Sequence, residues 1–168
     1  MFAPPREYES AVPALVGQAG YAHRLSPQVS VDGGVMRSQF FDRFAPGEST
    51  GYTEAYLGAS SRLFSAHLFY SPNYYRPGVH TLYMEADGSI ETVAQLRLNA
   101  HVGMLDYLRW PGVVGVPTVY YDWRIGVSRQ FGPLNLSGAL TGGGPGRDYY
   151  EGEGHSKTAV VVAAGWSF

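Results

Sequence analysis

The chain contains no cysteine, which excludes disulfide bonds and metal sites built on thiolates. Charge is also scarce, because Asp, Glu, Lys and Arg make up 15% of its 168 residues, against an average of about 25%. Lys157 is the single lysine, no basic run occurs, and the net charge is −2. A protein that binds nucleic acid needs a basic patch, so this class of function is excluded.

Long apolar runs are missing as well. The longest is the segment 159–166, whereas a transmembrane helix needs about 20 apolar residues. The N-terminal residues show no basic segment followed by an apolar one, so no signal peptide is expected within the chain. The sequence is rich in aromatic residues (14%), with 13 Tyr, which argues against a disordered chain.

Apolar residues recur at every second position, which is the period of a β-strand. From Val160 to Phe168, large apolar side chains alternate with small ones. Similar alternation extends upstream to a first candidate strand at Leu15–Leu25. About nine strands are predicted in this way, most of them near the 9–11 residues with which a tilted strand crosses a bilayer.

Short and long connections alternate between these strands. Short turns are expected at 26–27, 61–62, 87–89 and 132–133, and long loops at 42–50, 72–78, 106–117 and 142–155. The glycine-rich segment 142–146 lacks the Gly-Lys-Ser/Thr of a phosphate-binding loop, so we expect it in a flexible outer loop. Short turns on one side and long loops on the other are typical of outer-membrane barrels. The predicted fold is all-β, an antiparallel up-and-down transmembrane β-barrel with about 9–10 strands in this chain.

Alternation alone does not say which face lies outside, so a soluble lipocalin-like barrel that binds a ligand stays an alternative. Three features favour lipid. The polar face carries Gly, Ser, Ala and Thr where a solvated surface would carry Lys and Glu. The chain ends in an alternating strand with Phe168, the pattern that the outer-membrane assembly machinery recognises. Aromatic residues lie near predicted strand ends, as in membrane-interface girdles; the candidates are Tyr107, Trp110, Tyr121, Trp123, Trp166 and Phe168.

The predicted strand number is odd, whereas bacterial barrels have an even number of strands. Residues 1–14 are expected to be irregular, because Pro4, Pro5 and Pro13 disfavour a strand. Residues 15–168 are then the barrel domain. Further upstream strands and a signal peptide are therefore expected in a longer, even-numbered barrel.

Ionisable residues on the polar face are the candidates for lining the lumen. They are Glu54, His67, Glu85, Arg97, His101, Asp122 and Arg124. One interpretation is a polar pore whose charges set its selectivity. The other is a set of ion pairs that fills a narrow barrel, because side chains nearly fill the interior at about eight strands. The sequence leaves both interpretations open.

The sequence has no evident motif for catalysis or for a cofactor. The histidines show no metal-ligand spacing along the chain, and the Gly-x-Ser-x-Gly nucleophile motif does not occur. An outer-membrane lipid hydrolase using His155 and Ser156 is a remote alternative, because neighbouring residues of a strand point to opposite faces. We therefore expect no enzyme activity, no metal and no cofactor.

Six segments of the chain have a distinctive sequence. They are YTEAYLGAS from Tyr52, SAHLFYSPNYY from Ser65, VHTLYMEADGSI from Val79, LRLNAHVG from Leu96, YDWRIGVSRQFGPLNLSGALTG from Tyr121 and the terminal GWSF. Together they resemble the TorF-like porins, a bacterial family also called Gcw_chp. The resemblance spans Leu15–Phe168 and implies a Gram-negative outer-membrane β-barrel with a transport role and no catalytic residues.

The expected function is passive passage of small solutes through a polar lumen in the bacterial outer membrane. The expected partners are outer-membrane lipid and, through Phe168, the assembly machinery. The alternative is a filled structural or adhesive barrel that acts through its long outer loops.

Overall fold

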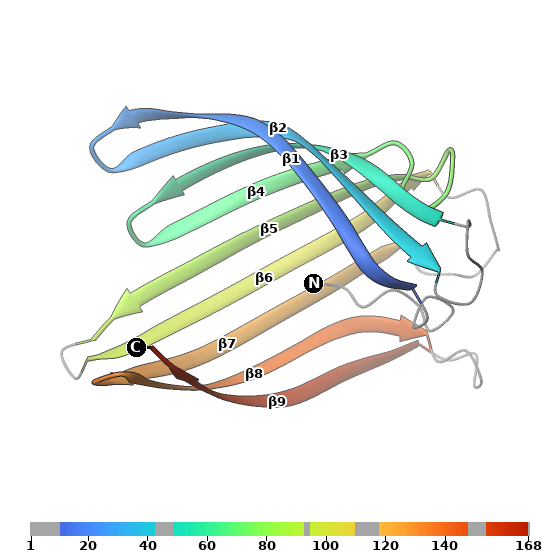
Figure 1. Ribbon diagram of the computed structural model, residues 1–168. Helices are drawn as coiled ribbons and strands as arrows, with labels where there is room; N and C mark the ends of the chain where they lie inside the picture. Colours follow the sequence, from blue (N-terminus) through green and yellow to red (C-terminus); the bar gives the residue numbers. More distant parts are fainter. Residues whose placement is uncertain (1–10, 43–48, 93–94, 110–117, 148–153, 168) are drawn as a thin grey trace.

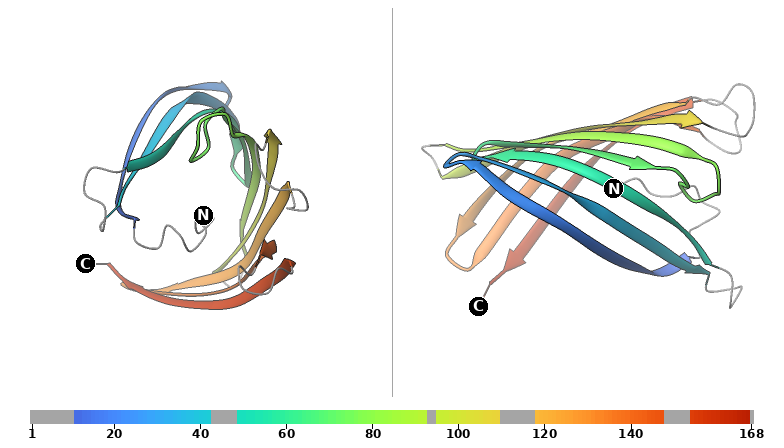
Figure 2. Two further views of the ribbon diagram at one scale, coloured as in Figure 1. Left: turned by 90° about the vertical axis from the view of Figure 1, so that its right-hand side faces the viewer. Right: turned by 90° about the horizontal axis from the view of Figure 1, so that it is seen from above.

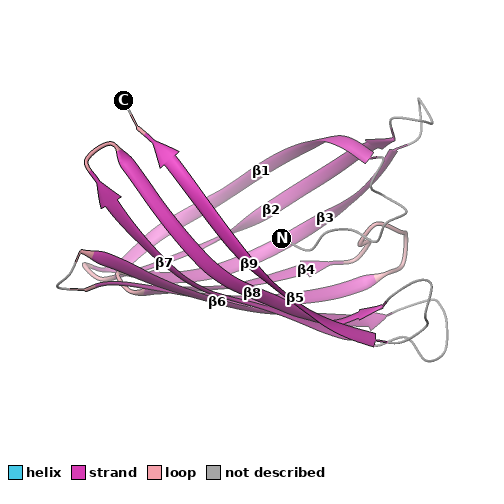
Figure 3. Ribbon diagram, turned by 90° about the horizontal axis from the view of Figure 1, so that it is seen from below, coloured by secondary structure: helices cyan, strands magenta, loops and turns pink. Residues whose placement is uncertain are grey.

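The fold is one antiparallel β-sheet in which each strand pairs with its neighbours in the sequence (Figure 1). The computed structural model describes residues 11–42, 49–92, 95–109, 118–147 and 154–167. These residues form nine strands joined by turns and loops (Figure 3). No helix in this described part of the chain is long and apolar enough to span a membrane. The predicted up-and-down antiparallel sheet is therefore confirmed.

The strands are long and rich in the β-branched and aromatic residues that favour a pleated sheet. Their bounds are β1 (Ala11–Ser26), β2 (Val29–Asp42), β3 (Ser49–Ser61), β4 (Phe64–Ser71), β5 (His80–Glu91), β6 (Leu96–Arg109), β7 (Val119–Phe131), β8 (Leu134–Arg147) and β9 (Gly154–Trp166). The first of them begins at Ala11, upstream of the expected start at Leu15. Pro13 fits this edge strand because its register with β2 shifts between Ala11 and Ala14.

The sheet curls strongly, so that it has a convex and a concave face (Figure 2). β1 and β9 are its edges, and they do not pair with each other within the described residues. In a sheet of nine antiparallel strands these two edges run in the same direction, so a direct pairing between them would be parallel. Closure into a barrel stays a prediction.

Three of the four expected short turns are confirmed, at 27–28, 62–63 and 132–133. The turn expected at 87–89 is wrong, because β5 runs on to Glu91. Asp87 has a partner on both sides, Ser65 in β4 and His101 in β6, so the ladder continues through this position. Polar residues at 87–89 resemble a turn in the sequence, but cross-strand pairing decides the structure.

The glycine-rich segment 142–146, expected in an outer loop, belongs to β8 instead. Gly142 pairs with Trp123 of β7, and a Cβ atom at Gly142 would lie 2.7 Å from the indole ring. Glycine therefore leaves room for the Trp123 ring within a continuous ladder. Likewise, β6 extends to Arg109, through part of the loop expected at 106–117.

The two faces of the sheet differ in polarity. Alternate residues of each strand point to opposite faces, and the more exposed large apolar side chains gather on one of them. Examples are Leu57 (68% exposed), Val102 (58%), Ile125 (63%) and Val160 (76%). The opposite face carries the less exposed polar side chains and lines a cavity that extends from the β3–β4 turn to Val161 of β9. Only the concave face can line one cavity across so many strands, so the concave face is polar and the convex face apolar.

Candidate functional site

Ionisable side chains form two adjacent rows across the concave face. Strand pairing aligns these rows, because directly opposite residues of neighbouring strands share a face. One row contains Asp32, Gly58, His67, Glu85, Gly103 and Asp122, and the next contains Ser60, Ser65, Asp87, His101 and Arg124. These two rows, which extend from β2 to β7, form the candidate site.

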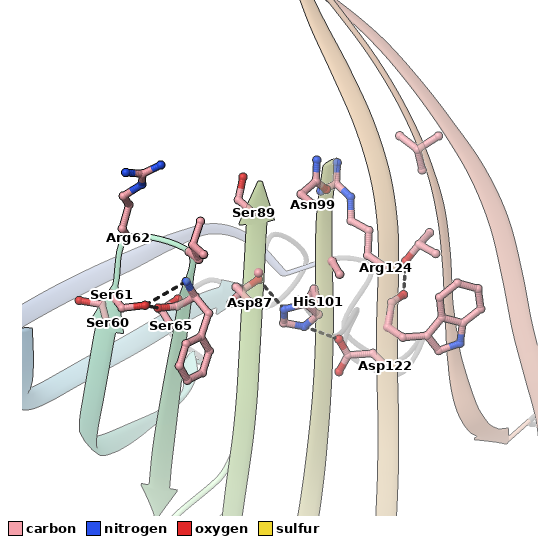
Figure 4. A pocket seen from close by; sticks show the side chains of 17 residues that line it. Ser60, Ser61, Arg62, Ser65, Asp87, Ser89, Asn99, His101, Asp122 and Arg124 are labelled. Atoms are coloured by element: carbon pink, nitrogen blue, oxygen red, sulfur yellow. Dashed lines mark hydrogen bonds and ion pairs between the residues drawn. The ribbon is translucent and has the colours of Figure 1, made fainter. Parts of the chain in front are cut away.

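His101, in the second row, lies between the carboxylates of Asp87 and Asp122 (Figure 4). Its Nδ1 atom is 2.9 Å from Asp87 Oδ1, and its Nε2 atom is 2.8 Å from Asp122 Oδ1. The hydroxyl of Tyr83 donates a hydrogen bond of 3.3 Å to the other oxygen of Asp122. The imidazole is therefore held in a fixed orientation by residues of β5 and β7.

His67 has a similar position in the first row. Its Nε2 atom lies 3.8 Å from Asp32 Oδ1, and its Nδ1 atom lies 3.7 Å from Glu85 Oε1. These separations are too long for hydrogen bonds, and the buried Nδ1 atom has no hydrogen-bond partner. Both histidines thus direct Nδ1 toward a carboxylate of β5 and Nε2 toward a carboxylate on the other side.

Glycines make room for these rings. A Cβ atom at Gly58 would overlap the His67 ring and lie 2.7 Å from Asp32 Oδ1. At Gly103, a Cβ atom would overlap the Tyr83 hydroxyl and lie 2.6 Å from Asp122 Oδ2. Real Cβ contacts of this length essentially do not occur, so the sheet carries glycine where the ring of the neighbouring strand crosses it.

A cavity of about 780 Å³ lies beside the site on the concave face. Asp87, His101, Asp122 and Arg124 line it, together with serines of the β3–β4 turn (Figure 4). Small solutes and ions can therefore reach the second row from this space.

A cluster of aromatic rings, here called the tyrosine cluster, lies nearer the end of the sheet that carries the long connections. It consists of Phe40, Tyr52, Tyr74, Tyr75, Tyr107 and Tyr120, with neighbouring ring centroids 4.7–6.1 Å apart. Tyr74 and Tyr75 belong to the β4–β5 connection, which bends toward the concave side (Figure 2). The rings thus span β2 to β7 and narrow the concave space at this end.

The β4–β5 connection is firmly packed. Asn73 Oδ1 accepts a hydrogen bond of 3.0 Å from the backbone N–H of Thr53, and Val79 is 1% exposed. Tyr75 has a φ of 56°, in the left-handed region, which is uncommon for a residue other than glycine. Burial raises the pKa of the Tyr74 and Tyr75 hydroxyls above the ordinary value, so both phenols stay neutral well into the alkaline range.

The structure places the predicted lumen residues at three levels of the concave face. Glu54 is buried beside the tyrosine cluster (8% exposed), while the two histidines, Glu85, Asp122 and Arg124 lie in the rows described above. Arg97 lies apart, at the turn end of β6, where it forms an ion pair with Glu91. The candidates omit Asp32 and Asp87, which complete the surroundings of the histidines. Both occur at polar positions of the alternation, so the sequence signal was present, but their partners depend on strand register.

Some of the predicted interface aromatics lie on the convex face of the sheet, and one lies on the concave face. Tyr121 and Trp166 lie on the convex face, and Trp123 lies there over Gly142. The prediction for Tyr107 is wrong, because its ring packs against Tyr74 and Tyr120 on the concave side. β6 continues past Met104 without a break, and its alternation turns Tyr107 inward. Trp110 and Phe168 lie outside the described residues.

Comparison with known families gives a match that covers nearly the whole chain. The family is described as a bacterial protein of unknown function (Gcw_chp), and its model matches residues 10–168. The comparisons with curated proteins and with solved structures find no match. The chain therefore belongs to the Gcw_chp family of bacterial proteins.

Proposed function

We propose that this chain forms the wall of an outer-membrane β-barrel, through which small polar solutes pass passively. The observation that carries the proposal is the distribution of polarity between the two faces. Apolar side chains cover the convex face, while charged and polar side chains line the concave one. A barrel in water has the opposite arrangement, whereas a barrel in lipid has an apolar exterior and a polar interior.

The apolar convex band crosses every strand from β1 to β9. One row along the pairing direction contains Tyr21, Leu57, Leu68, Met84, Met104 and Tyr121, and another contains Val29, Phe64, Ala100, Ile125, Leu140 and Val160. A continuous exposed apolar surface of this kind is a mark of membrane contact. Lipid in place of water also accounts for the low charge content of the sequence.

Arginines lie on the convex face toward both ends of the strands. Near the long connections, Arg37 donates hydrogen bonds of 3.1 Å to Thr53 and 2.9 Å to Gln39. At the turn end, the Arg129 guanidinium lies 4.9 Å from the centre of the Phe131 ring. Long cationic side chains at the borders of an apolar band reach the polar headgroups, so both positions support a membrane-spanning band.

Electrical recording from the refolded protein in a planar lipid bilayer tests passive passage. We expect stepwise conductance, and Arg124→Gln should shift ion selectivity toward cations because it removes a positive charge that lines the cavity. Arg129→Gln is the matched control, because this arginine lies on the convex face and its loss should leave selectivity unchanged. A correctly folded, inserted protein without conductance would contradict the proposal.

A second candidate function is a filled barrel that binds partners through its long connections. The tyrosine cluster favours it, because its rings narrow the concave space at the loop end. The same recording separates the two candidates, since a filled barrel inserts into the bilayer and carries no current.

A further inference from the structure

We propose that β4, β5 and β6 hold one divalent transition-metal ion of the zinc type on the concave face, with His67, Glu85, Asp87 and His101 as its ligands. The site goes beyond solute passage and does not depend on it. A metal ion bound in the wall of the sheet would join three neighbouring strands, whether or not the sheet conducts.

The donor atoms already converge. Glu85, Asp87 and His101 each offer one ligand atom, and these atoms lie within 4.8 Å of one another. His67 adds its Nδ1 atom, 3.7 Å from Glu85 Oε1. Two donors on one zinc ion are at most about 4.2 Å apart, twice the bond length. The donor atoms of Glu85, Asp87 and His101 are thus near the spacing of zinc ligands, and His67 adjoins this set through Glu85.

The orientation of both imidazoles fits metal binding. A histidine ligand uses one ring nitrogen for the metal and donates the N–H of the other to a carboxylate, which fixes its orientation. In His101, Nδ1 faces the β5 carboxylates while Nε2 lies 2.8 Å from Asp122. In His67, Nδ1 faces Glu85 while Nε2 faces Asp32. The two sides of β5 are thus similar in orientation, with Asp122 hydrogen-bonded to His101 and Asp32 facing His67 at 3.8 Å.

One of the proposed ligand atoms forms no hydrogen bond with the protein. His67 Nδ1 is buried and has no hydrogen-bond partner, although a buried polar atom without a partner is costly. This atom faces the carboxylate of Glu85 at 3.7 Å, and a metal ion between them would satisfy it.

The negative charge of the cluster also favours binding of a cation. Asp32, Glu85, Asp87 and Asp122 surround the two histidines, and in the described part of the chain none of these carboxylates forms an ion pair with arginine or lysine. Neutral histidines would leave this excess of negative charge without compensation. A divalent ion supplies the missing positive charge and uses the histidines in the neutral form that metal binding requires.

The donor types select the class of metal. Two imidazole nitrogens and two carboxylate oxygens suit zinc and related first-row ions, whereas calcium and magnesium prefer oxygen ligands only. The cavity that Asp87, His101 and Asp122 line gives an ion access from the concave space. The ligand positions 67, 85, 87 and 101 match no short metal-binding motif, so the site becomes visible only through the pairing of β4, β5 and β6.

Isothermal titration calorimetry with zinc chloride and with calcium chloride tests the site on the full chain, refolded in detergent at neutral pH. We expect one zinc ion per chain and much weaker calcium binding. His67→Asn and His101→Asn should each weaken zinc binding at least 10-fold. Asp122→Asn should weaken it roughly 10- to 100-fold, the effect of losing an outer carboxylate. His80→Asn is the control, because His80 contacts Tyr70 on the convex face and its loss should not change the affinity.

Refolding of each variant is checked by circular dichroism and by heat-modifiable mobility in gels. If a histidine variant fails to refold, Glu85→Gln and Asp87→Asn test the same ligand set with smaller changes in shape. The proposal is overturned if the folded protein binds no zinc at millimolar concentration, or if calcium binds as tightly as zinc. It is equally overturned if zinc binding is lost in His80→Asn and kept in the variants of the four ligands.

Discussion

On the concave face, several glycines lie next to ring side chains of the neighbouring strand. The ring of Tyr56 lies over Gly34, that of His67 over Gly58, and Tyr83 reaches over Gly103. Each glycine removes the side chain that would occupy the same space, so a ring can lie flat along the sheet. This pairing of a ring with a glycine on the next strand fixes the position of His67 and, through Tyr83, of Asp122.

Gly103→Ala should destabilise the protein, because its Cβ atom would lie 2.6 Å from Asp122 Oδ2 and overlap the Tyr83 hydroxyl. The rigid Tyr83 ring has to move, and overpacking of this kind costs about 1–3 kcal/mol. The free energy of unfolding, measured with urea on the refolded protein, checks the value.

Gly138→Ala is the matched control, because nothing lies within 4 Å of its Cβ position. We expect no loss of stability there, since alanine in a compatible backbone is neutral or slightly favourable. Equal stability of the Gly103→Ala variant and the wild type would show that the ring does not fill this position.

The sequence predicts the face of a residue better than its partner. Alternation correctly assigns His67, Glu85, His101 and Asp122 to one polar face. It gives no register, and a strand shifted by one pair of residues keeps every face but changes every neighbour. For this reason Asp87, which completes the His101 environment, is recognised only in the structure.

The sequence also predicts the number of strands better than it predicts where each strand ends. Alternation predicts about nine strands, and the described residues form nine, but glycine and polar residues mislead at their ends. The sequence places turns or loops at 87–89 and 142–146, where the ladder continues. In both places a ladder partner on a neighbouring strand outweighs the local preference for a turn.

The β4–β5 connection places two tyrosines of the tyrosine cluster at the loop end of the sheet. Its Tyr74 and Tyr75 pack against Tyr52 of β3, with ring centroids 4.8 Å apart in both pairs. These tyrosines lie within the two segments, YTEAYLGAS and SAHLFYSPNYY, that gave the family resemblance. The two segments therefore correspond to one structural unit at the loop end.

Removing both rings in a Tyr74→Ala/Tyr75→Ala variant should widen this end and raise single-channel conductance. Planar bilayer recording measures the change. Tyr21→Ala removes a ring that is 73% exposed on the convex face, so this control should conduct like the wild type. Unchanged conductance in the double variant would mean that the tyrosine cluster does not limit passage.

At the scale of the whole molecule, the account depends on which face meets lipid. The sheet has an apolar convex face and a polar concave one, and its edges β1 and β9 leave it unclosed within the described residues. Alternation in the sequence predicts two faces of different polarity but not the direction of curvature. The curvature comes from the twist and coiling of neighbouring strands, which depend on the whole sheet.

The chain contains no cysteine, so single labels can be introduced without a background. Spin labels at two positions on each face of β8, on Leu136→Cys, Ser137→Cys, Ala139→Cys and Leu140→Cys variants in lipid vesicles, measure exposure to lipid directly. We predict that oxygen, which partitions into lipid, relaxes the labels at 136 and 140, while a water-soluble nickel complex relaxes those at 137 and 139 more strongly. The opposite alternation, or access of the nickel complex to all four labels, would contradict a convex face in lipid.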